Sequence, residues 1–359
     1  MSKILNHMKL VPEFRGNTPR PLEELDGWLA GVHEDALEPD LPIVDPHHHI
    51  WDGGHGRYLL DEFLRDLRSG HNIVSTVFVQ VKTMYRVDAS EAMKPIGEVE
   101  FANGIAAASA SGYYGKTRVC EGIVGFADLL LGDAVEPVLE RLIRAGNGRL
   151  RGIRQGATWD SGSAAYGRKF GPRHLLREAS FRKGFSHLAS LGLSFDAWLY
   201  YHQLPDLVDL LCTFPETSVV LDHAGGILGI PPHTDRGVVF QIWQSNLRSL
   251  ARFPNLTVKI GGLGMLYNGW DFHVRESPPS SMDLANAWRP YVEECIEIFG
   301  PERCMFESNF PVDKQSCGYG QLWNAFKRIT HEFSVDEKAA LYHDTAARIY
   351  RLGGEAMRG

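Results

Sequence analysis

Short apolar segments alternate with longer amphipathic segments from Leu41 onward. Most of the short segments are rich in β-branched and other apolar residues, a pattern typical of parallel strands that are buried on both faces. They predict eight strands, at Ile43–Asp45, Ile73–Val81, Val119–Phe126, Leu150–Arg154, Leu193–Leu199, Ser218–Asp222, Leu256–Ile260 and Arg303–Glu307.

The segments between these strands repeat apolar residues with the spacing of an α-helix. Gly146 follows one segment directly, and Gly300 with Pro301 follows another, as helix stop signals. Ser334 and Glu337 have the spacing of a capping box at the start of the last segment. The predicted helices are Glu98–Tyr114, Ala134–Ala145, Phe181–Leu191, Pro205–Phe214, Val239–Phe253, Leu284–Phe299, Gln321–Thr330 and Val335–Leu352.

Eight consecutive strand–helix units predict an α/β fold, the (β/α)8 barrel of the TIM type. A doubly wound open sheet is the alternative, but no G-x-G-x-x-G follows an early strand. We assign residues 41–359 to the barrel and residues 1–40 to an N-terminal extension with one helix near Pro21–Ala30. Long connections at 156–173 and 261–283 follow strands four and seven. We therefore expect both at the carboxyl-terminal face, where barrels place their active sites.

The composition is that of a globular protein without a nucleic-acid or membrane partner. Of 359 residues, 44% are hydrophobic and 23% are charged, and the net charge of −7 is not offset by any basic stripe. No apolar run approaches the roughly 20 residues of a membrane span, and we expect no signal peptide. Five widely spaced cysteines without a C-x-x-C argue against a disulfide framework or a structural zinc site. We expect a cytoplasmic protein that acts on a small-molecule substrate, with a homodimer as the oligomeric state to test.

The histidine run that follows the first strand is the most informative motif. Side chains alternate between the two faces of a strand, so His47 and His49 point the same way. Two imidazoles at a strand end suit a divalent metal ion or a polarised carbonyl group. A histidine-rich turn without chemistry is the alternative.

Polar residues at the ends of other strands converge on the same barrel mouth. Each of them also has a structural interpretation: Lys259 and Arg151 could form ion pairs inside the barrel, and His202 could lie past its strand on a surface loop. Glu307 at an apolar strand end would be costly if unpaired. The converging residues, from strand four to strand eight, are Arg151, Arg154, His202, His223, Lys259, Glu307 and Asn309.

Several imidazoles, a carboxylate and two arginines at one mouth indicate hydrolysis of a small anionic carbonyl compound. The histidines, with or without metal, would polarise the carbonyl group, and Glu307 or His223 would activate water. Arg151 or Arg154 would hold the substrate carboxylate, with Arg275 in the second long connection as a further candidate, and Lys259 is another predicted substrate-binding residue. Trp270 and His273 of that connection would close over a flat substrate.

Taken together, D-x-H-H-H-x-W-D, LRGIRQ, VVLDHAGG, RCMFESNFPVD and TAARIYRL resemble the amidohydrolase-2 group of the amidohydrolase superfamily. The resemblance covers about Leu41 to Leu352 and is closest to the lactonase-like branch, which includes 2-pyrone-4,6-dicarboxylate hydrolase, fuconolactonase and sulfomuconolactonase. It implies a (β/α)8 barrel and hydrolysis of lactones or related carbonyl compounds. Some members of this family bind Zn²⁺ or Mn²⁺, and others act without a metal ion.

The resemblance also implies roles for single residues. The two metal-binding histidines on strand one of the family fall on His47 and His49. The position nearest to the family's strand-five metal histidine is His202, and the strand-six histidine falls on His223. The strand-eight aspartate, which normally activates water and binds metal, falls on Asn309, whose amide cannot take a proton at neutral pH.

Three explanations are open for the asparagine. Glu307 could have taken the role of the base. Asn309 could be a neutral ligand, or could orient water or an oxyanion, with His223 as the base. The site could also have lost hydrolysis. Asp313 is a weaker substitute for the aspartate.

Two other functions compete with a lactone hydrolase. A metal-dependent decarboxylase of an aromatic or unsaturated acid would use the same barrel, and it would release CO₂ where a lactonase releases an acid. A non-catalytic degenerate barrel is the third alternative, which Asn309 favours. The combination of His47, His49, His223 and Glu307 argues against it, because a partly satisfied buried polar cluster is destabilising.

Overall fold

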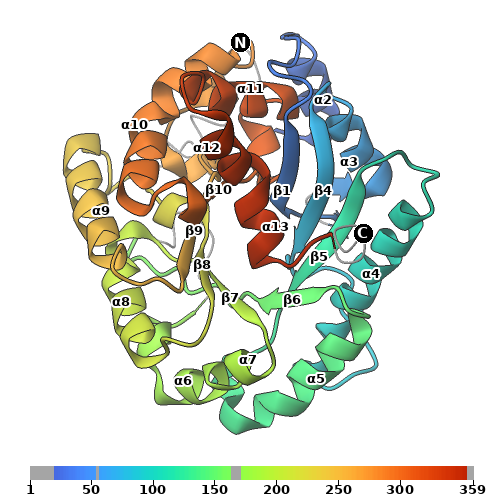
Figure 1. Cartoon of the computed structure of the whole chain (residues 1–359), viewed down its shortest axis with the longest axis vertical. Helices are drawn as coiled ribbons and strands as arrows, with labels where there is room; N and C mark the ends of the chain where they lie inside the picture. The colour runs from blue at the N-terminus through green and yellow to red at the C-terminus, as the bar shows by residue number, and fades with distance from the viewer. Residues whose placement is uncertain (1–19, 54–55, 163–170, 354–359) are drawn as a thin grey trace.

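Eight parallel strands form one sheet that curls into a barrel in the computed structural model, which describes residues 20–53, 56–162 and 171–353 (Figure 1). Neighbouring strands follow the order β1-β4-β5-β6-β7-β8-β9-β10. After β10 the chain returns to β1. There the backbone N–H of Asn309 donates to the His47 carbonyl at 2.9 Å, and the backbone N–H of His49 donates to the Phe310 carbonyl at 2.7 Å. The strands are β1 Pro42–His48, β4 Asn72–Val79, β5 Arg118–Gly125, β6 Leu150–Ile153, β7 Ser194–Ala197, β8 Val219–Leu221, β9 Leu256–Ile260 and β10 Cys304–Phe306. The predicted (β/α)8 barrel is confirmed.

Helices surround the sheet in Figure 1, mostly between successive strands, as the sequence predicts. In chain order they are α2 Leu22–Leu29, α3 Leu60–Leu67, α4 Ile96–Ala110, α5 Glu136–Ala145, α6 Ala179–Phe185, α7 His187–Ser190, α8 Leu204–Thr213, α9 Arg236–Leu250, α10 Ser281–Phe299, α11 Tyr319–Ile329, α12 Val335–Ala339 and α13 Thr345–Ile349. The predicted capping box at α12 is present: the Ser334 amide donates to Glu337 Oε2 at 2.8 Å, and the Glu337 amide donates to Ser334 Oγ at 3.3 Å.

Alternation along the strands produces two apolar layers. In β4, Val77 and Val79 belong to a small cluster inside the barrel, whereas Phe78 belongs to the large cluster between sheet and helices. Tyr350, directly after α13, packs in the inner cluster and closes the end of the barrel opposite the mouth. The inner apolar cluster is thus small, and buried polar residues occupy other parts of the barrel interior.

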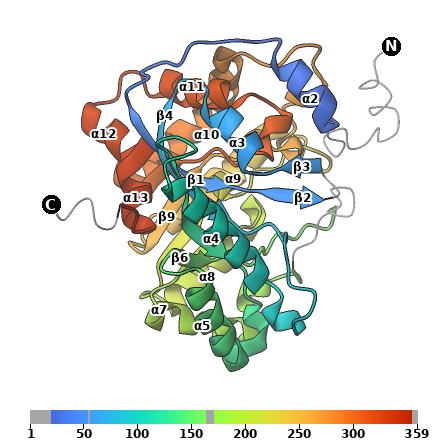
Figure 2. The same cartoon turned by 90° about the vertical axis from the view of Figure 1, so that its right-hand side faces the viewer.

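The fold differs from the sequence prediction in several places. A hairpin of β2 (Trp51–Gly53) and β3 (Gly56–Tyr58) follows β1, and its strands are too short to produce a detectable period. The last predicted helix is divided into α12 and α13 by a π-helical turn at Ala340–Asp344. Figure 2 shows the hairpin and α2 on one side of the barrel and α12 and α13 on the other.

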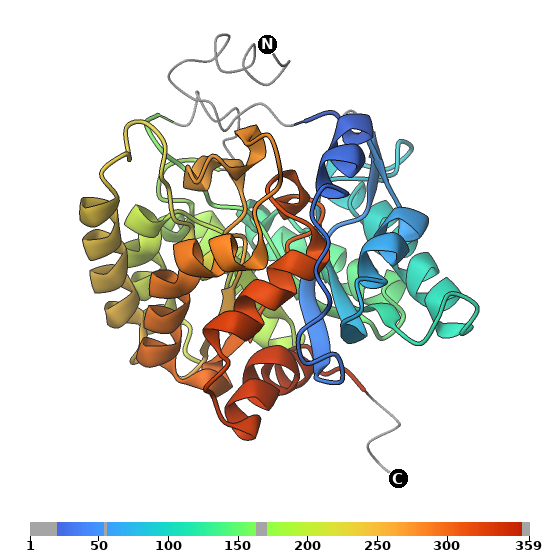
Figure 3. The same ribbon diagram turned by 90° about the horizontal axis from the view of Figure 1, so that it is seen from above.

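The described part of the N-terminal segment packs along the C-terminal helices (Figure 3). Lys327 of α11 donates to the carbonyls of Leu37 and Glu38 at 2.7 and 2.8 Å. Arg20 donates through Nε to the carbonyl of His273, in the long connection after β9, at 3.0 Å. In the described ranges no helix is long and apolar enough to cross a membrane. The five cysteines are free thiols.

Candidate active site

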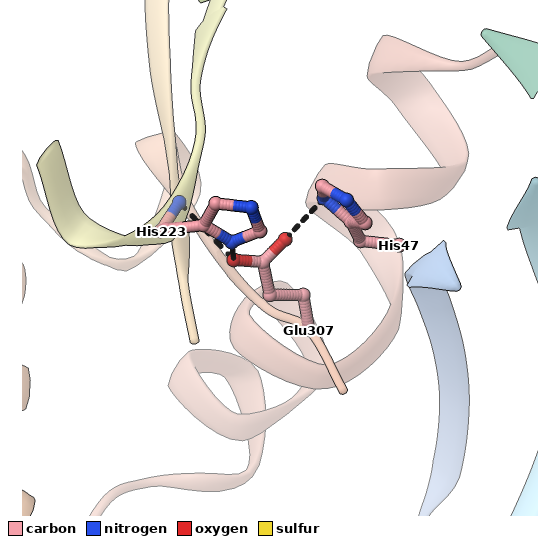
Figure 4. A group of neighbouring side chains, drawn as sticks. All are labelled: His47, His223 and Glu307. Atoms are coloured by element: carbon pink, nitrogen blue, oxygen red, sulfur yellow. Dashed lines mark hydrogen bonds and ion pairs between the residues drawn. The ribbon is translucent and has the colours of Figure 1, made fainter. Parts of the chain in front are cut away.

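Three residues from distant strands meet at the barrel mouth (Figure 4). His47 lies on β1, His223 directly follows Asp222 after β8, and Glu307 directly follows β10. Nδ1 of His47 lies 2.7 Å from Oε2 of Glu307, and Nδ1 of His223 lies 2.7 Å from Oε1. The backbone amide of His223 donates to the same Oε1 at 3.1 Å. All three side chains are buried, so one carboxylate joins two imidazoles in a site largely shielded from water.

Hydrogen bonding determines which ring nitrogens carry protons. Arg154 lies with Nη1 3.1 Å from Nε2 of His47. Because a guanidinium can only donate, Nε2 accepts, and the proton of a neutral His47 is on Nδ1, facing Glu307. Burial and the nearby Lys259 cation lower the pKa of His47 to about 4, so this imidazole is neutral near pH 7. In His223 the Nδ1 proton likewise faces Glu307, and its Nε2 points away from that carboxylate (Figure 4).

Glu307 is held ionised despite its burial. Burial favours the neutral carboxylic acid, but His223 and His47 outweigh it and bring the pKa of Glu307 below its usual range. A carboxylate with a lowered pKa is a poor acceptor of a proton from water. Its geometry suits it instead to orient the two imidazoles.

A second layer of buried charges lies beneath these three residues. Lys259 of β9 contacts Asp196 of β7 at 2.7 Å and Asp222 at 3.2 Å, and its Nζ lies 3.3 Å from Nδ1 of His47. Arg154 reaches Asp222 at 3.5 Å. Burial lowers the pKa of Lys259, but Asp196 and Asp222 outweigh this and raise it. The structure thus places Lys259, predicted as a substrate-binding residue, in a fully buried ion-pair network.

The other two histidines of the run have separate positions. Nδ1 of His49 lies 2.7 Å from the carbonyl of Val79, so this nitrogen donates and the ring is neutral, because burial places the pKa of His49 well below its usual value. Nε2 of His49 is therefore an acceptor and cannot donate to a carbonyl oxygen. His48 lies on the opposite face, stacked on Phe63 and hydrogen-bonded to Thr76 at 2.9 Å, as the strand period predicts.

Asn309 is directed into a loop contact and not toward Glu307. Its Nδ2 donates to Asp313 Oδ1 at 2.8 Å, and Asp313 Oδ2 accepts from the Gly264 amide at 2.7 Å. The backbone of Asn309 is left-handed, with φ 53°, which turns its side chain out of the strand alternation on which the sequence prediction rested. Asp313 is buried, which raises its pKa well above the usual value. The amide and the carboxyl group tie the loop after β10 to the loop after β9.

The other predicted substrate-binding residues are engaged elsewhere. The charged neighbours of Arg151 are Arg351, Glu121 and Arg149, not the histidines. Trp270, in the connection after β9, lies against the guanidinium of Arg236 of α9 at 3.8 Å, and Arg275 of the same connection pairs with Asp283 at 3.7 Å. The carbonyl of His273 holds Arg20 at 3.0 Å, and its side chain is buried. Trp270, His273 and Arg275 thus anchor the long connection.

Aromatic rings border the histidines. Trp198, which follows β7, meets the His223 ring edge-on at 4.6 Å and stacks with Tyr267 at 6.3 Å. Trp51 lies 6.2 Å from the His49 ring. Flat aromatic faces beside the imidazoles favour a planar or cyclic compound.

His202 belongs to a different group. In the described ranges, two sets of residues have metal-ligand atoms within 4.8 Å of one another: His47 with His223 and Glu307, and His202 with Asp160 and His233. Sequence reasoning missed Asp160 and His233 because both lie in loops, where no strand period indicates their direction. The first set fits a divalent ion chemically, since two imidazoles and a carboxylate are common zinc ligands. Glu307 Oε2 makes an ion-pair contact with His47 but has no hydrogen-bond partner in the described structure.

Comparisons with known proteins agree with the fold and with the motifs. A family model described as amidohydrolase matches residues 44–352. The uncharacterized protein y4mH of Sinorhizobium fredii is 34% identical over 336 residues, which are 87% of this chain and 99% of that protein. An L-fucono-1,5-lactonase of Burkholderia multivorans is 29% identical over 185 residues, which are 50% of this chain and 58% of that enzyme. A solved amidohydrolase structure from Burkholderia multivorans with bound zinc has a TM-score of 0.66 at 23% identity and covers 86% of this chain and 99% of its own, which supports the barrel fold.

Proposed function

Because the chain belongs to the amidohydrolase family, we propose that it is a hydrolase of a small lactone or related cyclic carbonyl compound that carries a carboxylate. The lactonase relative supports hydrolysis and the lactone class. The observation that carries the proposal is the contact of one ionised carboxylate, Glu307, with Nδ1 of both His47 and His223. This arrangement leaves Nε2 of His223 as a proton acceptor.

Two observations favour one of the three explanations for Asn309. Glu307 has a lowered pKa and is a weak base, and Asn309 is bonded to Asp313. We therefore assign the role of general base to His223, oriented by Glu307 through Nδ1. In the proposed reaction, Nε2 of His223 takes a proton from water as the water oxygen attacks the carbonyl carbon. The ring C–O bond then breaks, and the imidazolium returns the proton to the leaving oxygen.

Arg154 is the residue we assign to negative charge on the substrate. Its Nη1 group lies 3.1 Å from His47 Nε2, so its positive charge faces the same mouth as His223. Arg154 could stabilise the oxyanion that forms at the carbonyl or hold the substrate carboxylate. Arg151 has other charged neighbours and Arg275 pairs with Asp283, so neither is included in this proposal.

A divalent ion, if it binds at the mouth, would be held by His47, His223 and Glu307. Such an ion would supply Lewis-acid polarisation of the substrate carbonyl group. The residues of this chain would still provide the aromatic walls and the positive charge of Arg154.

The proposal is tested with His223→Asn and Glu307→Gln, assayed separately on a panel of carboxylated lactones. We expect kcat to fall by about 100-fold or more for His223→Asn, the usual contribution of a general base. Glu307→Gln should also lower kcat, because an amide orients the imidazoles less strongly. His48→Gln is the matched control, since that ring faces Thr76 and Phe63. Its stability should fall while the folded protein keeps its kcat.

The products separate the competing functions. Release of a titratable acid without CO₂ indicates a lactonase, whereas CO₂ release from an aromatic or unsaturated acid would indicate a decarboxylase. Wild-type kcat in both His223→Asn and Glu307→Gln would rule out the proposed mechanism.

A further inference from the structure

A second cluster of metal-ligand side chains lies outside the catalytic centre. Asp160 comes from the loop after β6, His202 lies in the short 3₁₀ turn Tyr201–Gln203 after β7, and His233 lies in the loop between β8 and α9. Asp160 is buried, and His202 and His233 are partly exposed. Three loops at the carboxyl-terminal face of the barrel thus meet at one point, which solvent can reach.

Two imidazole nitrogens approach one carboxylate oxygen in this cluster. Nε2 of His233 lies 3.0 Å and Nε2 of His202 lies 3.5 Å from Oδ2 of Asp160. The two rings are nearly parallel, with an interplanar angle of 6° and centroids 5.7 Å apart. The carbonyl of Trp159 lies 3.1 Å from the same Nε2 of His202. Two nitrogens and a carboxylate oxygen therefore face a common point, and the carbonyl oxygen lies beside one of the nitrogens.

The surroundings orient these ligands as the outer shell of a metal site does. The Tyr201 hydroxyl lies 2.9 Å from Nδ1 of His233, so its oxygen can accept a hydrogen bond from the Nδ1–H group when Nε2 binds a metal. The Gly162 amide donates to Oδ1 of Asp160 at 2.7 Å, which leaves Oδ2 facing the imidazoles.

Hydrogen bonds satisfy this cluster only in part. Nε2 of His202 can donate to the carbonyl of Trp159 and Nε2 of His233 to Oδ2 of Asp160, but Nδ1 of His202 has no hydrogen-bond partner in the described part of the chain. A cation at the common point would replace both protons and use both nitrogen lone pairs. The donor set of two imidazoles with oxygen ligands is one that zinc and related divalent ions accept.

We propose that Asp160, His202 and His233 form a binding site for a divalent metal ion of the zinc class, separate from the catalytic centre. The ion would join the loops that follow β6, β7 and β8. It would thereby fix the wall of the mouth next to Trp198, because Trp198 contacts Tyr200 at 5.7 Å and Tyr200 contacts His202 at 6.1 Å. The role of this site is to position the loops, and its residues take no part in the proposed reaction.

The test measures zinc directly. Full-length protein is stripped with a chelator, reloaded with Zn²⁺, passed through a desalting column and analysed for zinc per chain by mass spectrometry. We expect His202→Gln/His233→Gln to contain about one zinc ion less per chain than wild type. Glu307→Gln, altered only at the catalytic centre, should keep this ion. Asp160→Asn retains the acceptor for Gly162 and should bind the ion at least about tenfold more weakly.

A surface histidine provides the matched control. His187 lies 3.2 Å from Asp133 and 3.9 Å from Glu136, and among the described residues it belongs to neither group of metal-ligand side chains, so His187→Asn should keep the zinc content of wild type. Added Zn²⁺ should raise the Tm of wild type and Glu307→Gln but not of the double variant, which separates loss of the site from loss of folding. Equal zinc content in wild type and the double variant, including no zinc in either, would overturn the proposal.

Discussion

At the scale of single residues, two adjacent glycines allow the catalytic centre to form. Gly261 and Gly262 follow β9, and a Cβ atom at Gly261 would lie 2.3 Å from Cγ of Glu307. A Cβ atom at Gly262 would lie 2.5 Å from Nδ1 of His223, the nitrogen that faces Glu307. Gly262 also has φ +59°, which disfavours other residues. The approach of His223 to Glu307 thus depends on a position without a side chain.

The first prediction follows from this contact. Gly262→Ala should displace the His223 ring from Glu307 and lower kcat by about 100-fold, the cost of a displacement near 1 Å in an active site. The left-handed backbone should cost about 1–2 kcal/mol of stability in addition. Steady-state kinetics on the lactone substrate and urea unfolding measure the two effects.

Gly104 in α4 is the control for this substitution, because it is exposed and nothing lies within 4 Å of its added Cβ. Gly104→Ala should keep wild-type kcat and gain up to about 1 kcal/mol of stability. If Gly262→Ala retained the kcat of wild type, the contact between Gly262 and His223 would not matter for catalysis.

The sequence predicted some of these residues and not others for a physical reason. His47 and Glu307 lie on or directly after a strand, where period-two alternation and barrel closure determine the direction of a side chain. His223 was predicted from its place at the end of an apolar strand, although its backbone is left-handed, with φ 56°. Asn309 has a left-handed backbone, and His202 lies past its strand, so the period does not apply to either. The meeting of His202 with Asp160 and His233 depends on loop conformations, which no local pattern specifies.

At the scale of elements, the N-terminal segment supports helices far along the chain. Glu34 accepts a hydrogen bond from the amide of Ser281, the first residue of α10, at 2.7 Å, and also one from the Ser281 hydroxyl. It also contacts Asn324 of α11 at 3.4 Å. A carboxylate at the start of a helix satisfies a free amide and interacts favourably with the helix dipole.

The second prediction tests this support. Glu34→Ala should lower the free energy of unfolding by about 1–3 kcal/mol, because the Ser281 and Asn324 donors lose a largely buried partner. Glu293→Ala within α10 is the comparison, since Glu293 is half-exposed and pairs with Arg289 at 3.0 Å one helical turn away. That variant should lose less than about 1 kcal/mol. Equal losses in the two variants would show that the segment does not stabilise α10.

Elements with a clear apolar pattern or a strong stop signal were predicted most accurately. The strand over 256–260 and the C-terminal end of α10 at Phe299 agree with the structure, because an apolar period and a Gly300–Pro301 stop define them. The β2–β3 hairpin was missed because each of its strands has only three residues, and the eight-residue helix α3 was missed as well. The π-helical turn between α12 and α13 arises from packing against the end of the barrel, and no local signal indicates it.

At the scale of the whole molecule, buried ionisable groups make stability depend on pH. His71, before β4, is enclosed between the N-terminal segment and α11. Lys327 of α11 donates to its Nδ1 at 2.9 Å, and its Nε2 lies 3.2 Å from the carbonyl of Gly320. Protonation of His71 at Nδ1 would place the added proton against the Lys327 ammonium group, which donates to this nitrogen. Burial and Lys327 accordingly lower the pKa of His71 to about 4.

The third prediction concerns acid stability. In the unfolded chain a histidine has a pKa of about 6.5, so between about pH 6.5 and 4 the unfolded state binds a proton that the native state does not. Stability therefore falls as pH decreases through this window, and His71 should account for about 2 kcal/mol of the loss between about pH 7 and about pH 5. Glu98 and Asp45, whose pKa values burial raises to about 7 and about 6, act in the opposite direction. The test must therefore compare variants and not the total pH dependence.

His71→Gln retains hydrogen-bonding capacity and removes the titrating group. Its stability should fall by about 2 kcal/mol less than that of wild type between about pH 7 and about pH 5, measured by urea unfolding at each pH. Any loss of packing in the variant is the same at both pH values and cancels in the difference. His33→Gln serves as the control, because the His33 side chain is 90% exposed and has similar surroundings in the folded and unfolded states. If His71→Gln lost as much stability with falling pH as wild type, protonation of His71 would not contribute to acid unfolding. The acid sensitivity of the barrel would then come from other buried groups whose pKa is lowered, such as His47, His48 and Glu307.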